Sequence, residues 1–365
     1  MSGTRSGSKT SRTHVTCHKW RWSIRVTVSQ RRGQTAKHAQ MNESKTQPIG
    51  SHDGREPIGA TSASLALMTA ALWGGTPVAI SYSVDTLPPI GTAAIRFVLA
   101  ALFMLVWCRI EGTEVRLRTG QAKPALIAGL LLFVQIGLFH WGIAESNSSH
   151  ASLFINTFVF WVAAIDHFVT KADRLTIWRL LGLLLAATGV SLVLIKTGAV
   201  NDSNPATVVG DAPNFKGDCI LLASGFLLGI KIVYTKHALK TIEPSKLIFW
   251  HDVVGVVLFF AYCGLFETMQ TSDFNATAIW GLLYQGLVVA GLCFAVQTRL
   301  LGRHPASQLV IFSFTTPLFG IALGFLFRGD PLSPWLFVAG ICVACGILMV
   351  NTRQRTVVST VDEVA

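Results

Sequence analysis

The chain has 365 residues, of which 51% are hydrophobic and only 13% are charged, and its mean hydropathy is +0.51. Soluble domains carry roughly 25% charged residues, so this chain has too few charges to cover a surface that faces water. The composition therefore excludes an ordinary soluble protein and predicts an integral membrane protein.

Residues 1–60 supply most of the net charge of +11, because they contain eleven Lys and Arg against three acidic residues. They have no sustained apolar run, so we expect a disordered basic tail in the cytoplasm rather than a signal peptide. A basic tail would also suit nucleic acid or anionic lipid. We expect this tail to set the orientation of the chain and to bind no nucleic acid. Residues 353–365 should form a second cytoplasmic tail.

After residue 60, apolar runs of about 20 residues alternate with short polar breaks, and a helix of that length crosses the hydrocarbon core of a bilayer. Helices also satisfy their own backbone hydrogen bonds in lipid, where water cannot. The runs predict an all-α integral membrane protein with ten transmembrane helices, at residues 63–82, 90–108, 123–142, 150–170, 176–196, 216–236, 246–265, 278–298, 306–327 and 334–352.

Charges differ between alternate connections of the predicted spans. One set is basic and holds the N-terminal tail with Arg109, Arg116, Arg118, Lys171, Arg174, Lys236, Lys240, Arg299, Arg303, Arg353 and Arg355. The other set is mostly acidic and holds Asp85, Glu145, Asp202, Asp211, Glu267 and Asp273. Because basic connections stay inside, we expect a multi-pass protein of the cell (inner or plasma) membrane with both termini in the cytoplasm.

The two halves of the membrane region resemble each other. Asp173-Arg174-Leu175-Thr176 and Asp330-Pro331-Leu332-Ser333 lie 157 residues apart, and Trp178 and Trp335 keep that offset. The segments 61–197 and 214–352 would then hold five spans each. Since five is odd, the second repeat enters the membrane upside down. Inverted repeats are typical of transporters, which bind substrate near the middle of the membrane between the halves.

Several short motifs have a familiar order. They are Ala71-Leu72-Trp73-Gly74-Gly75, Leu87-Pro88-Pro89, Ala94-Ile95-Arg96-Phe97 and the two turns at Asp173 and Asp330. Over residues 63–352 the chain resembles the EamA family of the drug/metabolite transporter superfamily. The resemblance implies a ten-helix carrier with a central cavity that exports amino acids or other small metabolites. Asp replaces the family's usual Glu in both turns, and Phe158 stands where a proline is common.

Polar groups inside spans are costly unless they have a partner or a wet cavity, so they are candidates for a substrate site. Arg96 could neutralise an anionic substrate or make a structural hydrogen bond, and His251 could carry a proton or pair with Asp252. Lys231 could bind substrate or extend to the membrane surface. Glu145 and His150 are expected to face a loop.

Uncharged groups nearer the middle of the spans complete the candidate substrate site. Gly74-Gly75-Thr76-Pro77 is expected to break the first span and free backbone carbonyls. The uncharged candidates are Trp73, Thr76, Gln135, Asn156, Trp161, Tyr284 and Thr316, with Gln285 beside them. For Trp161 and Tyr284, packing between helices is the competing interpretation.

The sequence contains no P-loop, no H-E-x-x-H and no G-x-S-x-G motif, so we expect neither an enzyme nor ATP-driven transport, and no cofactor. The leading hypothesis is a secondary carrier of a small molecule, working in the lipid bilayer by alternating access. A carrier of nucleotide-sugars or sugar phosphates would want more cations than Arg96 and Lys231. A non-transporting sensor or assembly protein is the alternative outside transport. Glycine-rich helix faces would also allow a homodimer.

Overall fold

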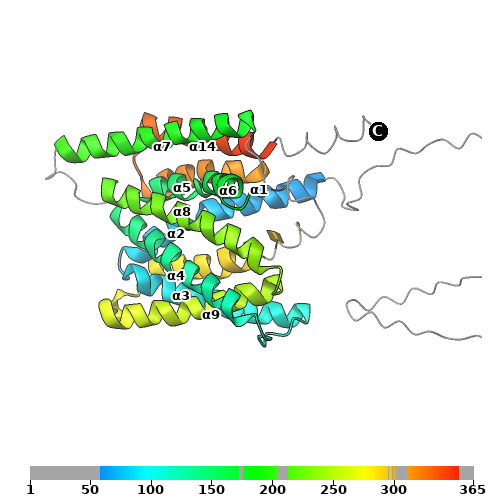
Figure 1. Cartoon of the computed structure of the whole chain (residues 1–365). Coiled ribbons are helices and arrows are strands. Elements are labelled where there is room, and N and C mark those ends of the chain that lie inside the picture. Colours follow the sequence, from blue (N-terminus) through cyan, green and yellow to red (C-terminus); the bar gives the residue numbers. More distant parts are fainter. Residues whose placement is uncertain are drawn as a thin grey trace, which may run out of the picture. The chain divides into compact units, whose positions relative to one another are not determined.

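The fold is taken from a computed structural model, which describes residues 58–171, 176–203, 213–294, 296–297, 300, 309 and 311–352. Every regular element within these ranges is a helix, which confirms the predicted all-α class (Figure 1). Residues 1–57 of the expected basic tail and the expected tail at 353–365 lie outside the described residues. So do residues 173–175, 211, 299 and 303, which were used to orient and align the spans.

The first half of the chain forms α1 (Ala60–Gly74), α2 (Thr76–Val84), α3 (Pro89–Glu111), α4 (Ala122–Glu145), α5 (Ser148–Ile155), α6 (Phe158–Phe168) and α7 (Ile177–Ser203). The second half forms α8 (Phe215–Ala238), α9 (Pro244–Phe266), the short η1 (Thr271–Asp273), α10 (Ala276–Leu283), η2 (Tyr284–Cys293), η3 (Ile311–Thr315), α13 (Thr316–Leu323), η4 (Gly324–Arg328) and α14 (Pro334–Thr352). Two of these, η2 and η4, are π-helices.

Eight helical segments of the described chain are long and apolar enough to cross a membrane, and two shorter apolar helices follow at Phe312–Arg328 and Pro334–Val350. Each lies on one of the predicted apolar runs. Proline occupies the first turn of α3 and of α9, where its missing N–H is not needed. The number of spans that enter a bilayer stays a prediction.

Two apolar runs are interrupted helices. The first run breaks at Gly75, between α1 and α2, as the Gly-Gly-Thr-Pro sequence predicts. The fourth run breaks between α5 and α6, which the sequence did not predict. There Asn156 Nδ2 donates to the Ser152 carbonyl at 2.7 Å, and Thr157 Oγ1 donates to the Phe154 carbonyl at 2.6 Å. These side chains compete with the helical hydrogen bonds, which explains the break.

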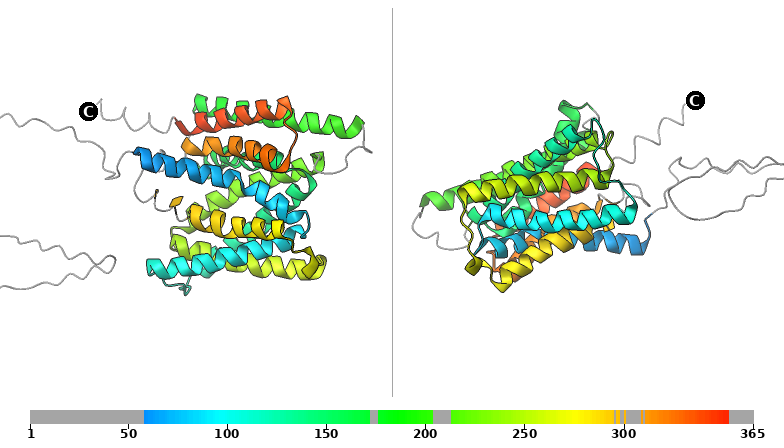
Figure 2. Two further views of the ribbon diagram at one scale, coloured as in Figure 1. Left: turned by 180° about the vertical axis from the view of Figure 1, so that it is seen from behind. Right: turned by 90° about the horizontal axis from the view of Figure 1, so that it is seen from below.

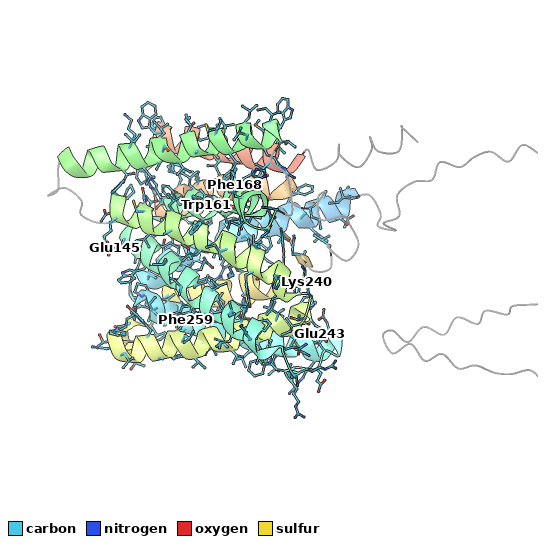
Figure 3. All side chains as sticks on the ribbon, in the orientation of Figure 1. Glu145, Trp161, Phe168, Lys240, Glu243 and Phe259 are labelled. Carbon is cyan, nitrogen blue, oxygen red and sulfur yellow. The ribbon has the colours of Figure 1, made fainter. Side chains whose placement is uncertain are left out.

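Glu145 lies at one end of the helical bundle, and Lys240 and Glu243 lie at the other end (Figure 3). Both ends tie the halves together. Lys216 Nζ is 3.1 Å from Glu145 Oε1, and Gln121 Nε2 donates to the Thr241 carbonyl at 2.9 Å. Glu145 ends α4 and Lys216 lies at the start of α8, while Gln121 precedes α4 and Thr241 follows α8, so the two helices run antiparallel.

α7 and α14 lie side by side along one edge of the bundle (Figures 1 and 2). Glycines bring the two backbones together, as is common between helices in membranes. A methyl group on Gly182 would lie 2.9 Å from the Gly346 carbonyl oxygen, and one on Gly189 would lie 3.1 Å from the Ala339 carbonyl oxygen. The helices are therefore antiparallel. Gly182 in the first repeat is equivalent to Ala339 in the second, and Gly189 is equivalent to Gly346, since the members of each pair are 157 residues apart. The two contacts therefore join the same two repeat positions, with the roles of the halves reversed.

Equivalent positions of the two repeats also make matching contacts between α4 and α9 and between η2 and α3. A methyl group on Gly129 of α4 would lie 3.3 Å from the His251 carbonyl oxygen of α9. A methyl group on Gly286 of η2 would lie 3.3 Å from the Arg96 carbonyl oxygen of α3. Gly286 is 157 residues after Gly129, and His251 is 155 residues after Arg96. Equivalent positions of the two halves thus make equivalent contacts.

α3 and α9 also touch each other at both ends. At the start of α3, the backbone N–H groups of Ile90 and Gly91 donate to the Glu267 carboxylate at 3.0 and 2.8 Å. At the start of α9, Trp250 Nε1 donates to the Val115 carbonyl at 2.7 Å. The end of each helix therefore meets the start of the other, so α3 and α9 are antiparallel.

Candidate functional site

A cavity of about 350 Å³ lies between the two halves of the chain. The first half contributes α1, α6 and α7 to its wall, and the second half contributes α8, η3, α13 and α14. Of the predicted site residues, Trp73 and Thr316 line it. The remaining lining residues are Ala66, Ala70, Phe158, Val159, Val162, Ala163, Asp166, Arg179, Ile232, Lys236, Gln297, Leu309, Phe312, Ser313 and Val350.

The charges on this cavity come from three helices. Asp166 of α6 accepts a hydrogen bond from Lys236 of α8, with 3.3 Å between Oδ2 and Nζ. Arg179 of α7 is buried on the wall. The rest of the lining is largely apolar or aromatic, so the cavity suits a small molecule with an apolar body.

Asn156 and Trp161 are not among the residues that line this cavity. The Asn156 amide is used at the break between α5 and α6. Trp161 packs edge-on against Phe226 of α8, with 5.0 Å between ring centroids, and its Nε1 is buried without a hydrogen-bond partner among the described residues. Figure 3 shows Trp161 on α6, which packs against α8.

A second cavity, of about 320 Å³, lies beside the break in the first span. Tyr284 lines it, and its hydroxyl donates to the Leu72 carbonyl at 2.7 Å. This confirms that the break frees a carbonyl for another partner. Thr76 is buried at the start of α2 and does not line the cavity. The other lining residues are Gly75, Val78, Ala79, Tyr82, Thr277, Trp280, Gly281, Leu323 and Phe327.

Gln135 is the centre of a buried polar chain that links α4 to α8. Its Nε2 donates to Ser224 Oγ at 3.2 Å, and Ser224 Oγ donates to the Gln135 carbonyl at 2.9 Å. Lys231 Nζ donates to Gln135 Oε1 at 3.1 Å. The ammonium of Lys231 is therefore held inside the protein, although its long side chain could have reached the membrane surface. Ser224 is a site residue that the sequence reasoning missed.

Arg96 is buried, with 7% of its surface exposed, and its Nε and Nη1 have no hydrogen-bond partner within the described ranges. Its guanidinium lies 5.2 Å from the ring centroid of Phe97. Lys231 and Asp252 are close enough to interact electrostatically with Arg96. His251 Nδ1 lies 3.1 Å from Asp252 Oδ1, as predicted, and 2.6 Å from the Ile248 carbonyl oxygen.

This cluster contains more positive than negative charge. Arg96 and Lys231 carry two positive charges, and Asp252 carries one negative charge. A buried charge without a partner is unstable in a low-dielectric surrounding. The cluster is therefore suited to an anionic group. Ile232, the residue after Lys231 on α8, lines the large cavity, whereas Arg96, Lys231 and Asp252 are not among its lining residues.

Sequence reasoning also missed buried groups near the Glu145 end of the bundle. His150 was expected to face a loop, and this was wrong, because it is 5% exposed and its Nδ1 lies 2.9 Å from Asp218 Oδ2. Ser146 Oγ donates to Asp218 Oδ1 at 2.7 Å. Asp330 is likewise buried and accepts hydrogen bonds from the Ser148 hydroxyl and the Ser149 backbone N–H at 2.6 and 2.8 Å.

Both buried carboxylates come from the second half and bind the start of α5 in the first half. A helix start carries free N–H groups and a partial positive charge, so carboxylates are stabilising there. In contrast, Glu145 is partly exposed and pairs with Lys216, as expected of a group near a loop. Within the described residues, no three His, Cys, Asp or Glu side chains are arranged to hold a metal ion.

Comparisons with known proteins place the chain in a family. Residues 60–195 and 215–352 each match the model of the EamA-like transporter family. The chain is 22% identical over 279 residues to the uncharacterized transporter YoaV of Bacillus subtilis (strain 168), which covers 76% of this chain and 92% of that protein. It is 24% identical over 298 residues to a probable amino-acid metabolite efflux pump of Salmonella typhimurium, covering 78% of this chain and 92% of the pump.

A solved structure, titled "Crystal structure of protein", has the same fold, with a TM-score of 0.57 and 16% identity over 80% of this chain and 99% of that one. The family matches cover both halves of the helical region described above. With its multiple apolar helices, the chain belongs to the EamA-like transporter family of membrane proteins.

Proposed function

We propose that this chain is a secondary transporter that exports amino acids or related small metabolites with a carboxylate. In this proposal it spans the cell membrane ten times with both termini in the cytoplasm, and it alternates access between two inverted five-helix repeats. The relatives named as probable amino-acid metabolite efflux pumps, from Salmonella typhimurium and Escherichia coli, support this class of substrate.

The antiparallel contacts between equivalent helices support the inverted arrangement. α3 and α9 occupy equivalent places in the two sequence repeats, and so do α7 and α14. Each of these pairs is antiparallel. Two repeats that entered the membrane in the same direction would place equivalent helices parallel. The exchange of the Gly129 and Gly286 contacts is also what a twofold relation between the repeats would produce.

One observation carries the assignment of a carboxylate substrate, and it is that Nε and Nη1 of the buried Arg96 have no hydrogen-bond partner among the described residues. A buried Arg with free N–H donors binds a carboxylate well, because its donors match two carboxylate oxygens. Lys231 adds a second positive charge, and Gln135 positions its ammonium. We assign the carboxylate to Arg96 and Lys231.

We assign the remainder of the substrate to the large cavity, where Trp73 and Thr316 form part of the wall. In this proposal Trp161 and Asn156 support the cavity from the break between α5 and α6. Tyr284 and Thr76 hold the break in the first span, and His251 positions Asp252. Movement of the two halves about these breaks would expose the site to each side in turn.

The test is export of amino acids from cells that make equal membrane amounts of the native chain, Arg96→Gln or Arg109→Gln. Arg109 is a matched control, because it is an exposed Arg in the last turn of the same helix. Loss of a buried charge contact is worth at least 1.4 kcal/mol, so we expect Arg96→Gln to lower export at least about tenfold. Arg109→Gln should export normally. Equal export by Arg96→Gln and the native chain would contradict the assignment.

A further inference from the structure

His140 of α4 is a buried histidine with one ring nitrogen unused. Its Nδ1 lies 3.0 Å from the Ile136 carbonyl oxygen, one turn earlier in the helix. A carbonyl can only accept, so Nδ1 carries a hydrogen. In the neutral ring, Nε2 is then a bare acceptor. Nε2 is buried and has no hydrogen-bond partner in the part of the chain that the structure describes.

Gln285 of η2 presents a second unused acceptor beside this ring. Its Nε2 donates to the Ala79 carbonyl and to Ser83 Oγ, both at 3.0 Å. Because the Ala79 carbonyl can only accept, the orientation of the amide is fixed, with Oε1 as the other atom. Gln285 Oε1 is buried and has no hydrogen-bond partner among the described residues, and the Gln285 side chain is close enough to the imidazole of His140 to interact with it.

Two buried acceptors next to each other are an unfavourable arrangement, because neither has a hydrogen to share. A proton on His140 Nε2 would give both a partner through an N–H donated to Gln285 Oε1. His140 belongs to the first repeat and Gln285 to the second. The new hydrogen bond would therefore join the two repeats.

The charged groups around His140 determine when it can hold a proton. Arg96 on α3 is close enough to interact with it electrostatically, and Lys231 on α8 and Asp252 on α9 interact with Arg96. His251 on α9 pairs with Asp252. Burial and the positive charge of Arg96 both oppose a second positive charge nearby. An anion bound to Arg96 would remove part of that repulsion.

We propose that His140 Nε2 is a proton-binding site, closed by Gln285 Oε1, which is occupied together with a carboxylate bound to Arg96. The inference rests on the proposed function, since the carboxylate is the proposed substrate. One proton is taken from water on one side with each carboxylate and is returned to water on the other side. Because each ion favours the binding of the other, they travel in the same direction. An inward proton gradient then opposes export, so the chain releases substrate that is in excess in the cell.

The first test needs no identified substrate. The full chain is labelled with ¹⁵N-histidine, purified in micelles and titrated by NMR between about pH 5 and pH 8, where a histidine ordinarily gains its proton. The signal of His140 is assigned from its loss in His140→Gln. The titration is done on the native chain with and without acetate, on Arg96→Gln, and on His237→Gln as a control, since His237 is an exposed histidine in the last turn of α8.

In the native chain without acetate, we expect the His140 ring to carry hydrogen on Nδ1 alone. In Arg96→Gln its Nε2 should bind hydrogen at a higher pH than in the native chain, because one of the two opposing effects is gone. Acetate should have the same effect on the native chain and on His237→Gln. If neither Arg96→Gln nor acetate changes the protonation of the His140 ring relative to the native chain, the proposal is overturned, and a water molecule bridging Nε2 and Gln285 Oε1 is indicated instead. Because Arg96→Gln requires no ligand, this outcome does not depend on the proposed substrate.

The second test measures coupling in vesicles that contain the purified chain and a mixture of the twenty common amino acids. With one proton per carboxylate, an imposed difference of about one pH unit should shift the final distribution of the transported amino acid about tenfold. His140→Gln should abolish this shift. If the native chain transports the amino acid but its final distribution does not depend on the pH difference, the proton site is overturned and the proposed function stands. Absence of any transport by the native chain would overturn the proposed function, and the NMR titration would still decide the proton site.

Discussion

Removal of the Asp218 carboxylate should destabilise the contact between the two halves near the Glu145 end. Asp218 is fully buried and accepts hydrogen bonds from Ser146 Oγ at 2.7 Å and from His150 Nδ1 at 2.9 and 3.0 Å. It also lies in the first turn of α8, where a negative charge is favourable. Asp218→Ala would leave a hydroxyl and an imidazole N–H buried without an acceptor.

Asp218→Ala removes the acceptor of two buried donors, and each buried polar group that loses its partner costs about 1–3 kcal/mol, with more where the bond is to a charged group. We therefore expect Asp218→Ala to lower the free energy of unfolding by about 3–5 kcal/mol. Asp218→Asn keeps one oxygen acceptor and the shape of the side chain. Its effect should be smaller, about 1–2 kcal/mol, because a neutral acceptor makes weaker hydrogen bonds.

The free energy of unfolding can be measured by titration with a denaturing detergent in mixed micelles, followed by tryptophan fluorescence. Lys216→Ala is the control, because it removes an ion pair at the same end whose Lys side chain is 65% exposed. Such pairs contribute about 0.2–1 kcal/mol. If Asp218→Ala were no less stable than Lys216→Ala, the buried cluster would not stabilise the fold in the way described.

Three further changes test other parts of the fold by the same titration. Gly320→Ala should lower the free energy of unfolding by about 1–3 kcal/mol, because the added methyl group would overlap the Ser152 hydroxyl. Glu267→Ala should lower it by about 0.5–2 kcal/mol, because the carboxylate caps the start of α3. A hydrogen bond from its own backbone N–H and the Lys246 ammonium, which pairs with it at 3.0 Å, hold the pKa of Glu243 below its ordinary value. The stability from this carboxylate is therefore complete above its ordinary pKa and is lost as the pH falls through the lowered value. Glu243→Gln should abolish this pH-dependent loss of stability.

Each of these predictions has a simple contradiction. Gly264→Ala adds a methyl group in open space, and equal effects at Gly264 and Gly320 would show that crowding at Ser152 is not the cause. A Glu267→Ala chain with native stability would contradict the capping role. For Glu243, titrations at about pH 3 and about pH 7 bracket the carboxylate. An acid loss of stability that is the same in Glu243→Gln and the native chain would contradict that assignment.

The helical segments could be predicted from the sequence because lipid requires long apolar runs, and a run such as 123–142 has no other stable form in a membrane. The break at Gly75 was also predictable, since two glycines and a proline adjoin it. The break at Asn156 was not, because its cause is local competition for hydrogen bonds by polar side chains within an apolar run. The π-helical geometry of η2 and η4 has no signal in the apolar pattern.

The candidate site was harder to predict, because it depends on which residues meet across the two halves. Arg96 and Lys231 were found because charges are rare inside spans. His150 was misjudged because its partner Asp218 is 68 residues away along the chain. His140 was overlooked for the same reason, since its importance comes from Gln285 in the other half.

Counterflow in vesicles tests the central claim, that this chain alone carries a small metabolite, most directly. The vesicles contain purified protein and an unlabelled mixture of the twenty common amino acids, and labelled amino acids are added outside. A carrier that alternates access should exchange them, so we predict transient accumulation of label inside with the native chain and with Arg109→Gln, and none with Arg96→Gln. If the native chain accumulates no label, or if Arg96→Gln accumulates as much as the native chain, the carrier mechanism with a carboxylate site at Arg96 is contradicted.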